Sequence, residues 1–369
     1  MSFCKQCILK ESNPTIVFNE DGICNVCNKT INLSGNFRSY SDAMRAFNGF
    51  RKNVLNGNDS SYDCLLMFSG GKDSIYMLNK LVTEDKLNVL AFTINHPFES
   101  SNAINNINKV VEKLNVEYIN YTPDLKKYKK LMKYTFLNGK SQTTNRTPCL
   151  ICTYYMQLNT LLFAYKMNIP YVLYCADPEQ ITMLTVSIHD IADMIKNICG
   201  DEIMEELFGD NLNLFYSDND SNKMPKLIFP YVEYGNYNKD NIISKLKELE
   251  LYDNKPSETH CSLRTLLDYY SFINYDCHFY ALENATSIRS KEVNRDDEIE
   301  FISKYKDIVL NIASKNMITP EEKTYIKSVI EKHGLGPQQQ YENTYDNVIR
   351  LVESANELGL DLKQMRKKP

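Results

Sequence analysis

The stretch of sequence that decides the fold runs Cys64-Leu65-Leu66-Met67-Phe68-Ser69-Gly70-Gly71-Lys72-Asp73-Ser74. Its first half is a short, unbroken apolar run, which is typical of a strand buried on both faces of a sheet. Its second half is a polar loop with two glycines, and residues 75–82 continue with a helical pattern. A buried strand that passes through such a loop into a helix predicts an anion site, because the first amides of the helix face the loop.

The same alternation continues on the carboxyl side of the loop. Apolar runs at residues 88–95, 116–121 and 171–176 predict further strands, and residues 102–114 and 153–167 predict helices between them. Strands that alternate with helices of this length predict an α/β fold with a doubly wound, mostly parallel sheet. We therefore expect a zinc-binding knuckle at residues 1–35, a helical connector at 36–60, a nucleotide-binding α/β domain at 61–238 and a mostly helical C-terminal region at 239–369.

Each residue of the loop has a chemical reason to bind a nucleotide. Two glycines let the backbone approach a phosphate closely, and Lys72 supplies a point charge for it. Asp73 would be out of place beside an anion unless a cation lies between them, so it is assigned to Mg²⁺ or to holding the loop. The bland alternative is a glycine-rich turn without a ligand. The predicted nucleotide-binding residues are Ser69, Gly70, Gly71, Lys72, Asp73 and Ser74.

Two cysteine pairs lie near the N-terminus. Cys4-x-x-Cys7 is followed, after sixteen residues, by Cys24-x-x-Cys27, with Gly22 just before the second pair. Two residues between cysteines let both sulfurs reach one ion, and two such pairs are the ligand set of a structural Zn²⁺ knuckle. The alternatives are two unrelated pairs or a redox-active pair.

Composition excludes several classes of protein. The chain has 369 residues, 43% of them apolar and 24% charged, as expected of a globular protein and not of a disordered one. Its net charge of −5 makes nucleic-acid binding an unfavoured function, although the basic run at residues 126–130, with Tyr128 inside it, leaves that function open. No apolar segment suits a membrane span or a signal peptide, so a cytoplasmic location is expected.

A second cysteine group lies farther along the chain. Thr147-Pro148-Cys149-Leu150-Ile151-Cys152 opens a predicted helix, and Cys261 follows in a distant loop. A thiol at a helix N-terminus is expected to have a lowered pKa. A Cys-x-x-Cys pair with one distant cysteine resembles the set that certain tRNA-thiolating PP-loop enzymes use to hold a 4Fe–4S cluster with one open iron. Three readings stay open for Cys149, Cys152 and Cys261: ligands of such a cluster, a zinc site or reactive thiols at the catalytic centre, or structural cysteines.

The loop string Ser-Gly-Gly-Lys-Asp-Ser resembles the pyrophosphate loop of the PP-loop ATP pyrophosphatases, also called the adenine nucleotide alpha hydrolase-like superfamily. The resemblance covers roughly residues 62–300 and implies a HUP-type sheet and ATP cleavage between the α and β phosphates. In that superfamily the AMP half activates a carbonyl-type oxygen of the substrate, and a nitrogen or sulfur nucleophile then displaces AMP.

The N-terminal cysteines with Gly22 are similar to the opening of the N-acetyl sugar amidotransferase family of surface-polysaccharide synthesis. The late stretch Ser290-Lys291-Glu292-Val293-Asn294-Arg295 also resembles that family, except that Asn294 stands where the family tends to carry arginine. The resemblance implies an ATP-dependent amidotransferase that uses Mg²⁺ and Zn²⁺, acts on a small-molecule acceptor and takes ammonia from a separate glutaminase. It also implies a phosphate contact for Arg295.

Two other functions remain open at this stage. The first is sulfur transfer that makes a thioamide or a thiolated tRNA base through Cys149, Cys152 and Cys261, with catalysis shared by Lys72 and Asp73. The second is a nucleotide-binding regulator that kept the loop and lost the chemistry.

Overall fold

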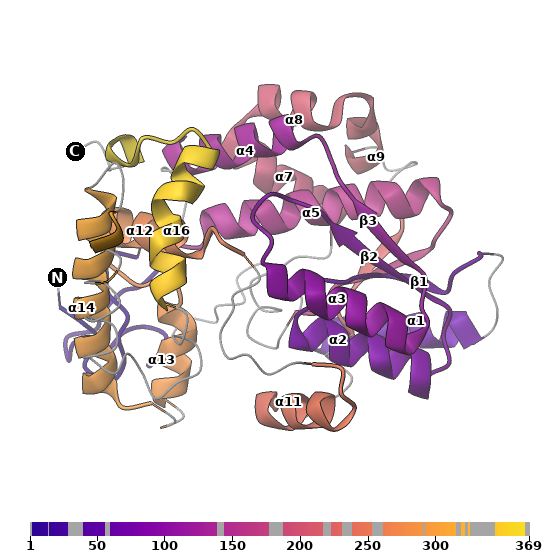
Figure 1. Ribbon diagram of the computed structural model, residues 1–369, viewed down its shortest axis with the longest axis horizontal. Coiled ribbons are helices and arrows are strands. Elements are labelled where there is room, and N and C mark those ends of the chain that lie inside the picture. The colour runs from indigo at the N-terminus through magenta and orange to yellow at the C-terminus, as the bar shows by residue number, and fades with distance from the viewer. Residues whose placement is uncertain are drawn as a thin grey trace. The chain divides into compact units, whose positions relative to one another are not determined.

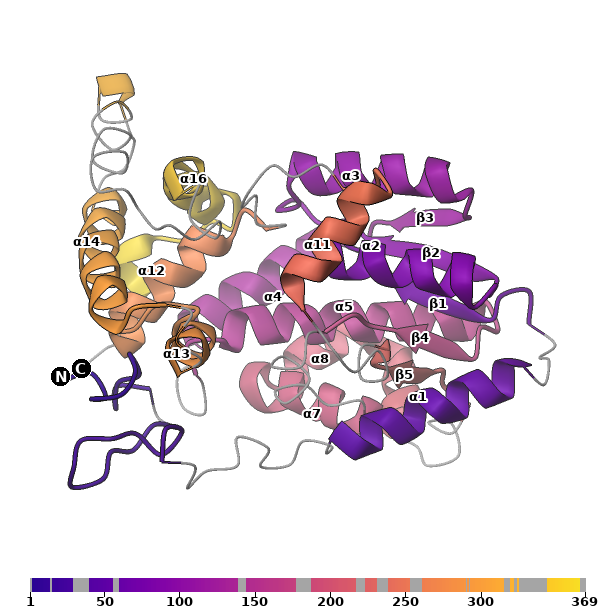
Figure 2. The ribbon, with the colours of Figure 1, turned by 90° about the horizontal axis from the view of Figure 1, so that it is seen from below.

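The sheet of the protein is built from five parallel strands, which are all labelled in Figure 2 and seen from another side in Figure 1. The computed structural model describes residues 2–13, 15–28, 40–55, 60–138, 144–176, 187–216, 223–230, 238–252, 261–289, 291, 293–314, 319–321, 324 and 344–365. The strands are β1 (Cys64–Met67), β2 (Val89–Ile94), β3 (Tyr118–Tyr121), β4 (Tyr171–Leu173) and β5 (Lys226–Ile228). The predicted α/β class with a doubly wound sheet is confirmed.

The order of the strands, β3-β2-β1-β4-β5, places the first strand in the centre. The chain builds the sheet outward from β1 to β3 and then returns to the other side of β1 for β4 and β5. The connections after β1 therefore run to one side of the sheet and the connection to β4 runs to the other, although all strands stay parallel. The carboxyl ends of β1 and β4 border this topological switch point. In open α/β sheets ligands bind at such a point.

The helical connector that the sequence predicts at residues 36–60 contains a long helix, α1 (Tyr40–Leu55). Its packing on the sheet was not part of that prediction. The other helices are α2 (Lys72–Asn79), α3 (Ser101–Leu114), α4 (Leu125–Asn138), α5 (Thr147–Lys166), α7 (Ile188–Cys199), α8 (Asp201–Phe208), α9 (Leu212–Tyr216), α11 (Lys239–Glu248), α12 (Arg264–Tyr275), α13 (Ala281–Arg289), α14 (Arg295–Ala313) and α16 (Thr344–Glu357). Short π or 3₁₀ turns cover Lys80–Glu84, Gly209–Asn211 and Leu362–Met365.

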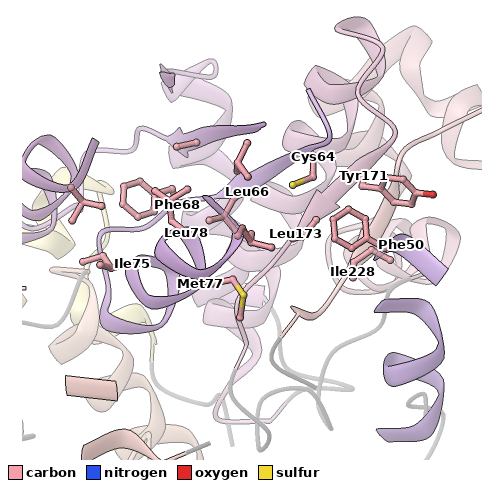
Figure 3. Close-up of a cluster of buried hydrophobic side chains, with 14 of the residues drawn as sticks. Phe50, Cys64, Leu66, Phe68, Ile75, Met77, Leu78, Tyr171, Leu173 and Ile228 are labelled. Atoms are coloured by element: carbon pink, nitrogen blue, oxygen red, sulfur yellow. The ribbon is translucent and has the colours of Figure 1, made fainter. Parts of the chain in front are cut away.

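The helices of the sheet unit cover both faces of the sheet, with α2 and α3 on one side and α5 and α7 on the other (Figures 1 and 2). Side chains alternate between these faces. Cys64, Leu66 and Phe68 join the apolar cluster on the α2 side, where Leu78 lies beside them (Figure 3). On the other face Phe92 meets Phe163 of α5, with the ring centroids 4.6 Å apart. Burial on both faces explains why β1 and β2 are unbroken apolar runs.

The sheet cluster also includes α1. Phe47, Phe50 and Val54 of this helix are buried, and the Phe50 ring meets the edge of Tyr171 from β4 at 5.0 Å. Figure 3 shows Phe50 and Tyr171 side by side at the β4 end of the cluster. The segment predicted as a connector therefore contributes part of the core.

The chain divides into two units that do not follow its linear order. One unit combines Met1–Asn32, Lys129–Ile151 and Pro256–Pro369, and the other combines Leu33–Tyr128 with Cys152–Lys255. The second unit contains the sheet. In the first, α12, α14 and α16 pack against one another. No helix among the described residues is both long enough and apolar enough to cross a bilayer.

A charged network lies inside this helical unit. Asp268 of α12 is fully buried and pairs with Arg264 one turn earlier, at 3.1 Å from Nε to Oδ2. The Tyr305 hydroxyl donates to the same oxygen, and His278 Nε2 lies 3.3 Å from Oδ1. Arg264 and Tyr305 both donate to one oxygen of this buried carboxylate, and the contact with Tyr305 links α12 to α14.

Candidate nucleotide site and metal centre

The glycine loop lies at the carboxyl end of β1, as predicted. Phe68 N–H still donates to Phe92 of β2, at 2.7 Å, and the Thr93 hydroxyl donates to the carbonyl of Phe68. These contacts hold the end of the strand until the chain turns away. Helix α2 then begins at Lys72, with Gly71 as its N-cap. Because glycine has no side chain to cap the helix, the first amides of α2 face the loop.

Gly70 is required for two independent reasons. Its φ of +68° is a left-handed conformation that favours glycine. A Cβ at this position would lie 2.4 Å from the carbonyl oxygen of Ala103 and 2.9 Å from Cγ1 of Ile107, both on α3. The Asn106 side chain of the same helix donates to the Gly70 carbonyl at 3.1 Å. Helix α3 therefore packs directly on the loop and holds its shape.

The polar side chains of the loop contact one another. The hydroxyls of Ser69 and Ser74 are 3.3 Å apart, and the Ser74 hydroxyl also donates to the Gly71 carbonyl at 3.1 Å. Lys72 Nζ pairs with Asp73 Oδ2 at 2.6 Å, and both side chains are largely shielded from solvent. The loop thus has its cation and its carboxylate close together, and a phosphate or a metal ion would compete for them.

The charge of Asp73 acts on two groups outside the loop, Cys175 and Tyr252. Burial raises the pKa of the Cys175 thiol, just beyond β4, and the negative charge of Asp73 raises it further. The pKa of Tyr252 is raised in the same way, first by burial and then by Asp73. Asp73 is therefore close enough to Cys175, just beyond β4, for its charge to act on that thiol. The loop and its acid therefore occupy the position where ligands of this fold class bind.

The N-terminal cysteines converge as predicted. The four sulfurs of Cys4, Cys7, Cys24 and Cys27 all lie within 4.8 Å of one another, with 3.7 Å between Cys7 and Cys24 and 4.0 Å between Cys4 and Cys27. Four thiolates at about 2.3 Å from one tetrahedral Zn²⁺ would be about 3.8 Å apart. The thiolates of a 4Fe–4S cluster bind different irons and lie farther apart. The spacing therefore fits a single ion.

The backbone supports this cluster. Amides of Gln6 and Cys24 donate to the Cys4 sulfur at 3.4 and 3.2 Å, and a bridge between Phe18 and Cys24 closes the hairpin. Without a metal, the hydrogen bond from Cys7 lowers the pKa of Cys24 to about 5, and the same contact raises the pKa of Cys7. Sulfurs this close cannot all ionise without a cation, so metal binding and deprotonation are linked.

Arg295 contacts the knuckle. It is the first residue of α14, and its Nε and Nη2 donate to the Cys4 carbonyl at 3.2 and 2.8 Å, while Nε also donates to the Cys7 carbonyl at 3.1 Å. A guanidinium beside a cluster of thiolates is electrostatically favourable. The predicted phosphate contact of Arg295 stays a prediction.

The second cysteine group has mixed surroundings. Cys149 lies in the first turn of α5, as predicted, but its expected lowered pKa is wrong. Burial raises the pKa, and the charges of Arg146 and Arg264 only partly offset that effect. Cys152 is buried, and its sulfur lies 3.2 Å from the Tyr128 hydroxyl. That Cys149, Cys152 and Cys261 share one ligand sphere stays a prediction.

Tyr128 is not a surface residue. Its side chain is 1% exposed and packs among His96, Phe98 and Tyr155, so it cannot stack on a nucleic-acid base at the surface. The sequence leaves nucleic-acid binding open because of this tyrosine inside the basic run at residues 126–130. Its burial removes that support.

Sequence reasoning missed two features of the sheet edge. Asn106, which binds the Gly70 carbonyl, is a polar residue in an amphipathic helix and carries no motif signal. His96 and Glu99 follow β2 and lie 3.9 Å apart from Nε2 to Oε2, both largely buried. The sequence could have pointed to this pair only because both residues directly follow a predicted strand.

Comparisons with known proteins give structural neighbours at low similarity. No family model matches the chain, and no curated protein matches its sequence. The U34-tRNA thiolase NcsA from Methanococcus maripaludis with its [4Fe-4S] cluster aligns at 18% identity and a TM-score of 0.32, over 79% of this chain and 87% of that one. The NMN synthetase from Francisella tularensis aligns at 13% identity and a TM-score of 0.34, over 69% of this chain and 94% of that one.

A third neighbour is the NH3-dependent NAD synthetase from Campylobacter jejuni. It aligns at 14% identity and a TM-score of 0.30, over 59% of this chain and 90% of that one. Likeness at this level carries no inference about activity, so the function is argued from the site.

Proposed function

We propose that the chain is a PP-loop ATP pyrophosphatase that activates an amide oxygen with AMP and replaces that oxygen with nitrogen from ammonia. The acceptor is an N-acetyl sugar, probed most simply in its nucleotide-linked form. The products are an amidine, AMP and pyrophosphate. The observation that carries the proposal is Gly70, where a left-handed backbone packed on α3 presents the start of α2 to the switch point.

The chemistry follows from these residues. The first amides of α2 and Lys72 bind the phosphates, and the charge of Lys72 offsets the charge that leaves with pyrophosphate. The Ser69 and Ser74 hydroxyls donate to phosphate oxygens. Asp73 would hold Mg²⁺, which supplies charge neutralisation when bound. An amide oxygen is a poor leaving group, and adenylation converts it into a good one. The protein contributes to this transfer mainly by positioning the reactants and by neutralising charge.

The knuckle has a structural role in this proposal. Cys4, Cys7, Cys24 and Cys27 would hold Zn²⁺, and Arg295 fastens that centre to the start of α14. Ammonia would come from a separate glutaminase, and the protein would work in the cytoplasm. The resemblance at the N-terminus supports the sugar acceptor.

Sulfur transfer is the second candidate. Cys149 and Cys152 are one turn apart on α5, and Arg146 and Arg264 both favour the thiolate form of Cys149. Such a thiol could carry sulfur, or the pair could bind a 4Fe–4S cluster with Cys261. Protein purified without oxygen separates the candidates: iron and labile sulfide in stoichiometric amounts favour sulfur transfer, and zinc alone favours amidotransfer.

The proposed activity is tested directly with small molecules. The protein is incubated with Mg·ATP, ammonium chloride and UDP-N-acetylhexosamines, and AMP and pyrophosphate are measured. We expect equal amounts of both, dependent on the acceptor and lost in Lys72→Ala. Lys126→Ala, which removes an exposed lysine of α4, is the matched control. ADP and inorganic phosphate as products would contradict cleavage between the α and β phosphates.

A further inference from the structure

The peptide bond between Gly70 and Gly71 is held by a side chain of α3. Asn106 is only 8% exposed, and its Nδ2 donates to the Gly70 carbonyl at 3.1 Å. Ala103 and Ile107, on the same face of the helix, limit the space beside the Gly70 Cα. Those two contacts fix where Gly70 lies. The hydrogen bond from Asn106 is the contact of α3 that depends on where the carbonyl points.

Steric exclusion alone allows this peptide bond two orientations. Gly70 has a φ of +68°, and Gly71, the N-cap of α2, has a φ of −81°. Half a turn of the peptide plane between them would change ψ of Gly70 and take φ of Gly71 to a positive value. Glycine tolerates both changes. Two consecutive glycines therefore permit a close approach to a phosphate, but they do not decide which end of the peptide faces it.

In the observed orientation the amide of Gly71 lies on the hydroxyl side of the loop. The peptide is trans, so its C=O and N–H groups point in opposite directions and the Gly71 N–H points away from Asn106. This N–H donates to the Ser69 hydroxyl at 3.4 Å, and that hydroxyl lies 3.3 Å from the hydroxyl of Ser74. A hydrogen bond of 3.4 Å is long, so a stronger acceptor can replace it.

The opposite orientation would disfavour an anion. It would bring the Gly70 carbonyl oxygen to the side of the two hydroxyls and turn the Gly71 N–H away from them. Phosphate oxygens are attracted by N–H groups at the start of a helix, whereas a carbonyl oxygen carries a partial negative charge and repels them. A donor that holds the Gly70 carbonyl on the far side therefore favours the form of the loop that binds phosphate.

We propose that Asn106 is a positioning residue for ATP, which keeps the Gly71 N–H directed at the phosphates by holding the Gly70 carbonyl. This inference rests on the proposed function, in which the loop binds the phosphates of ATP. Asparagine suits the role because its amide nitrogen donates without carrying a charge that would attract the phosphates away from the loop. An ionised carboxylate in its place would accept only and would repel the carbonyl.

The test replaces this donor with one that depends on pH. In Asn106→Asp the ionised side chain cannot donate, whereas the protonated acid can donate to the Gly70 carbonyl. Burial is expected to raise the pKa of a carboxyl group at this position. Calorimetric titration measures the affinity for Mg·ATP relative to the unmodified chain at the same pH. We expect Asn106→Asp to bind about tenfold more weakly at about pH 8 and to recover most of that loss toward about pH 5.

Two further variants control for charge and for folding. Asn105→Asp makes the same change of charge at the adjacent, exposed position of α3, so it should bind Mg·ATP like the unmodified chain at every pH. Asn106→Leu fills a similar space without a donor and should bind about 3- to 10-fold more weakly, with no recovery at low pH. It serves in place of Asn106→Asp if the carboxylate prevents folding. Thermal melting confirms that each variant is folded.

A second readout follows the amide itself. In the chain labelled with ¹⁵N-glycine, Mg·ATP should shift the Gly71 amide resonance in the unmodified chain and in Asn105→Asp, but in Asn106→Asp only at low pH. Equal affinity in Asn106→Asp and Asn105→Asp, or a loss of affinity that does not change with pH, would overturn the proposal. Pyrophosphate release alongside such a result would leave the proposed function standing. A pH-dependent loss of affinity in a chain that releases no pyrophosphate would support this inference and contradict the proposed function.

Discussion

The nucleotide loop and the cysteine knuckle are both short motifs, but they are held in place in opposite ways. The knuckle brings its own ligands: four cysteines within 24 residues of sequence meet through local turns. The loop depends on a distant helix, because the backbone of Gly70 is shaped by contacts with Ala103, Asn106 and Ile107. A local motif should fail when its ligands or its ion are removed. A motif that depends on a distant element should fail when a substitution keeps that element from packing on it, as a side chain at Gly70 would do to α3.

Removal of a cysteine ligand should have the largest effect. Cys24→Ser removes one of the four thiolate ligands, so bound zinc is expected to fall from one ion per chain to none. Because structural zinc contributes about 10 kcal/mol or more to folding of its site, the knuckle should unfold with that loss. Metal analysis and thermal melting, with and without a chelator, measure this. Cys277→Ala is the control, since it removes a buried thiol of the same unit outside the knuckle. Zinc retained by Cys24→Ser would refute the four-cysteine site.

A methyl group at Gly70 should have the next largest effect. Gly70→Ala is expected to lower the free energy of unfolding by about 2–4 kcal/mol, through strain at positive φ and through the clash with α3. Gly200→Ala is matched to it, because Gly200 also has positive φ, +88°, but nothing lies within 4 Å of its Cβ position. Urea unfolding of both variants measures the difference. Equal losses would show that α3 does not constrain the loop.

The pair His96 and Glu99 gives a smaller effect with a definite sign. Folding raises the pKa of Glu99 from 4.5 to about 7, so the folded state binds more protons and stability falls as pH rises between these values. Folding lowers the pKa of His96 from 6.5 to about 4, so stability rises with pH over that window. The two slopes oppose each other between pH 4.5 and 6.5.

Single variants should separate the two slopes. Glu99→Gln is expected to become more stable as pH rises from 4 to 6.5, and His96→Gln less stable as pH rises from 4.5 to 7. Either change is at most roughly 3 kcal/mol over its window. Urea unfolding at a series of pH values measures both. Two variants with parallel pH profiles would mean that the pair is not buried in its neutral form.

Most of the sheet could be predicted from sequence, because β1, β2 and β4 are buried and form short, mostly apolar runs. The knuckle and the nucleotide loop could be placed from spacing alone. Contacts made by residues that are distant in the sequence could not be predicted. Nothing in the sequence signals that α3 packs on Gly70, or that Tyr128 is buried inside a basic run. The sequence predicts a helix within residues 36–60, but only as a connector, because its contacts with the sheet depend on the tertiary structure.

The two cysteine groups differ for the same reason. Cys4, Cys7, Cys24 and Cys27 are brought together by local turns, so their spacing is informative. Cys149 was expected to ionise easily at a helix N-terminus, but burial outweighs the helix and the two nearby arginines. The degree of burial depends on the tertiary structure, and a single sequence does not report it.

The central claim is that the glycine loop binds ATP, and calorimetric titration with Mg·ATP tests it most directly. Lys72→Ala removes a charge-assisted contact to phosphate and leaves Asp73 without its partner at 2.6 Å. Affinity should fall about 10- to 150-fold, which corresponds to about 1.5–3 kcal/mol. Lys126→Ala should bind like the unmodified chain. Equal affinity in Lys72→Ala and the unmodified chain, or no binding by either, would contradict the nucleotide assignment.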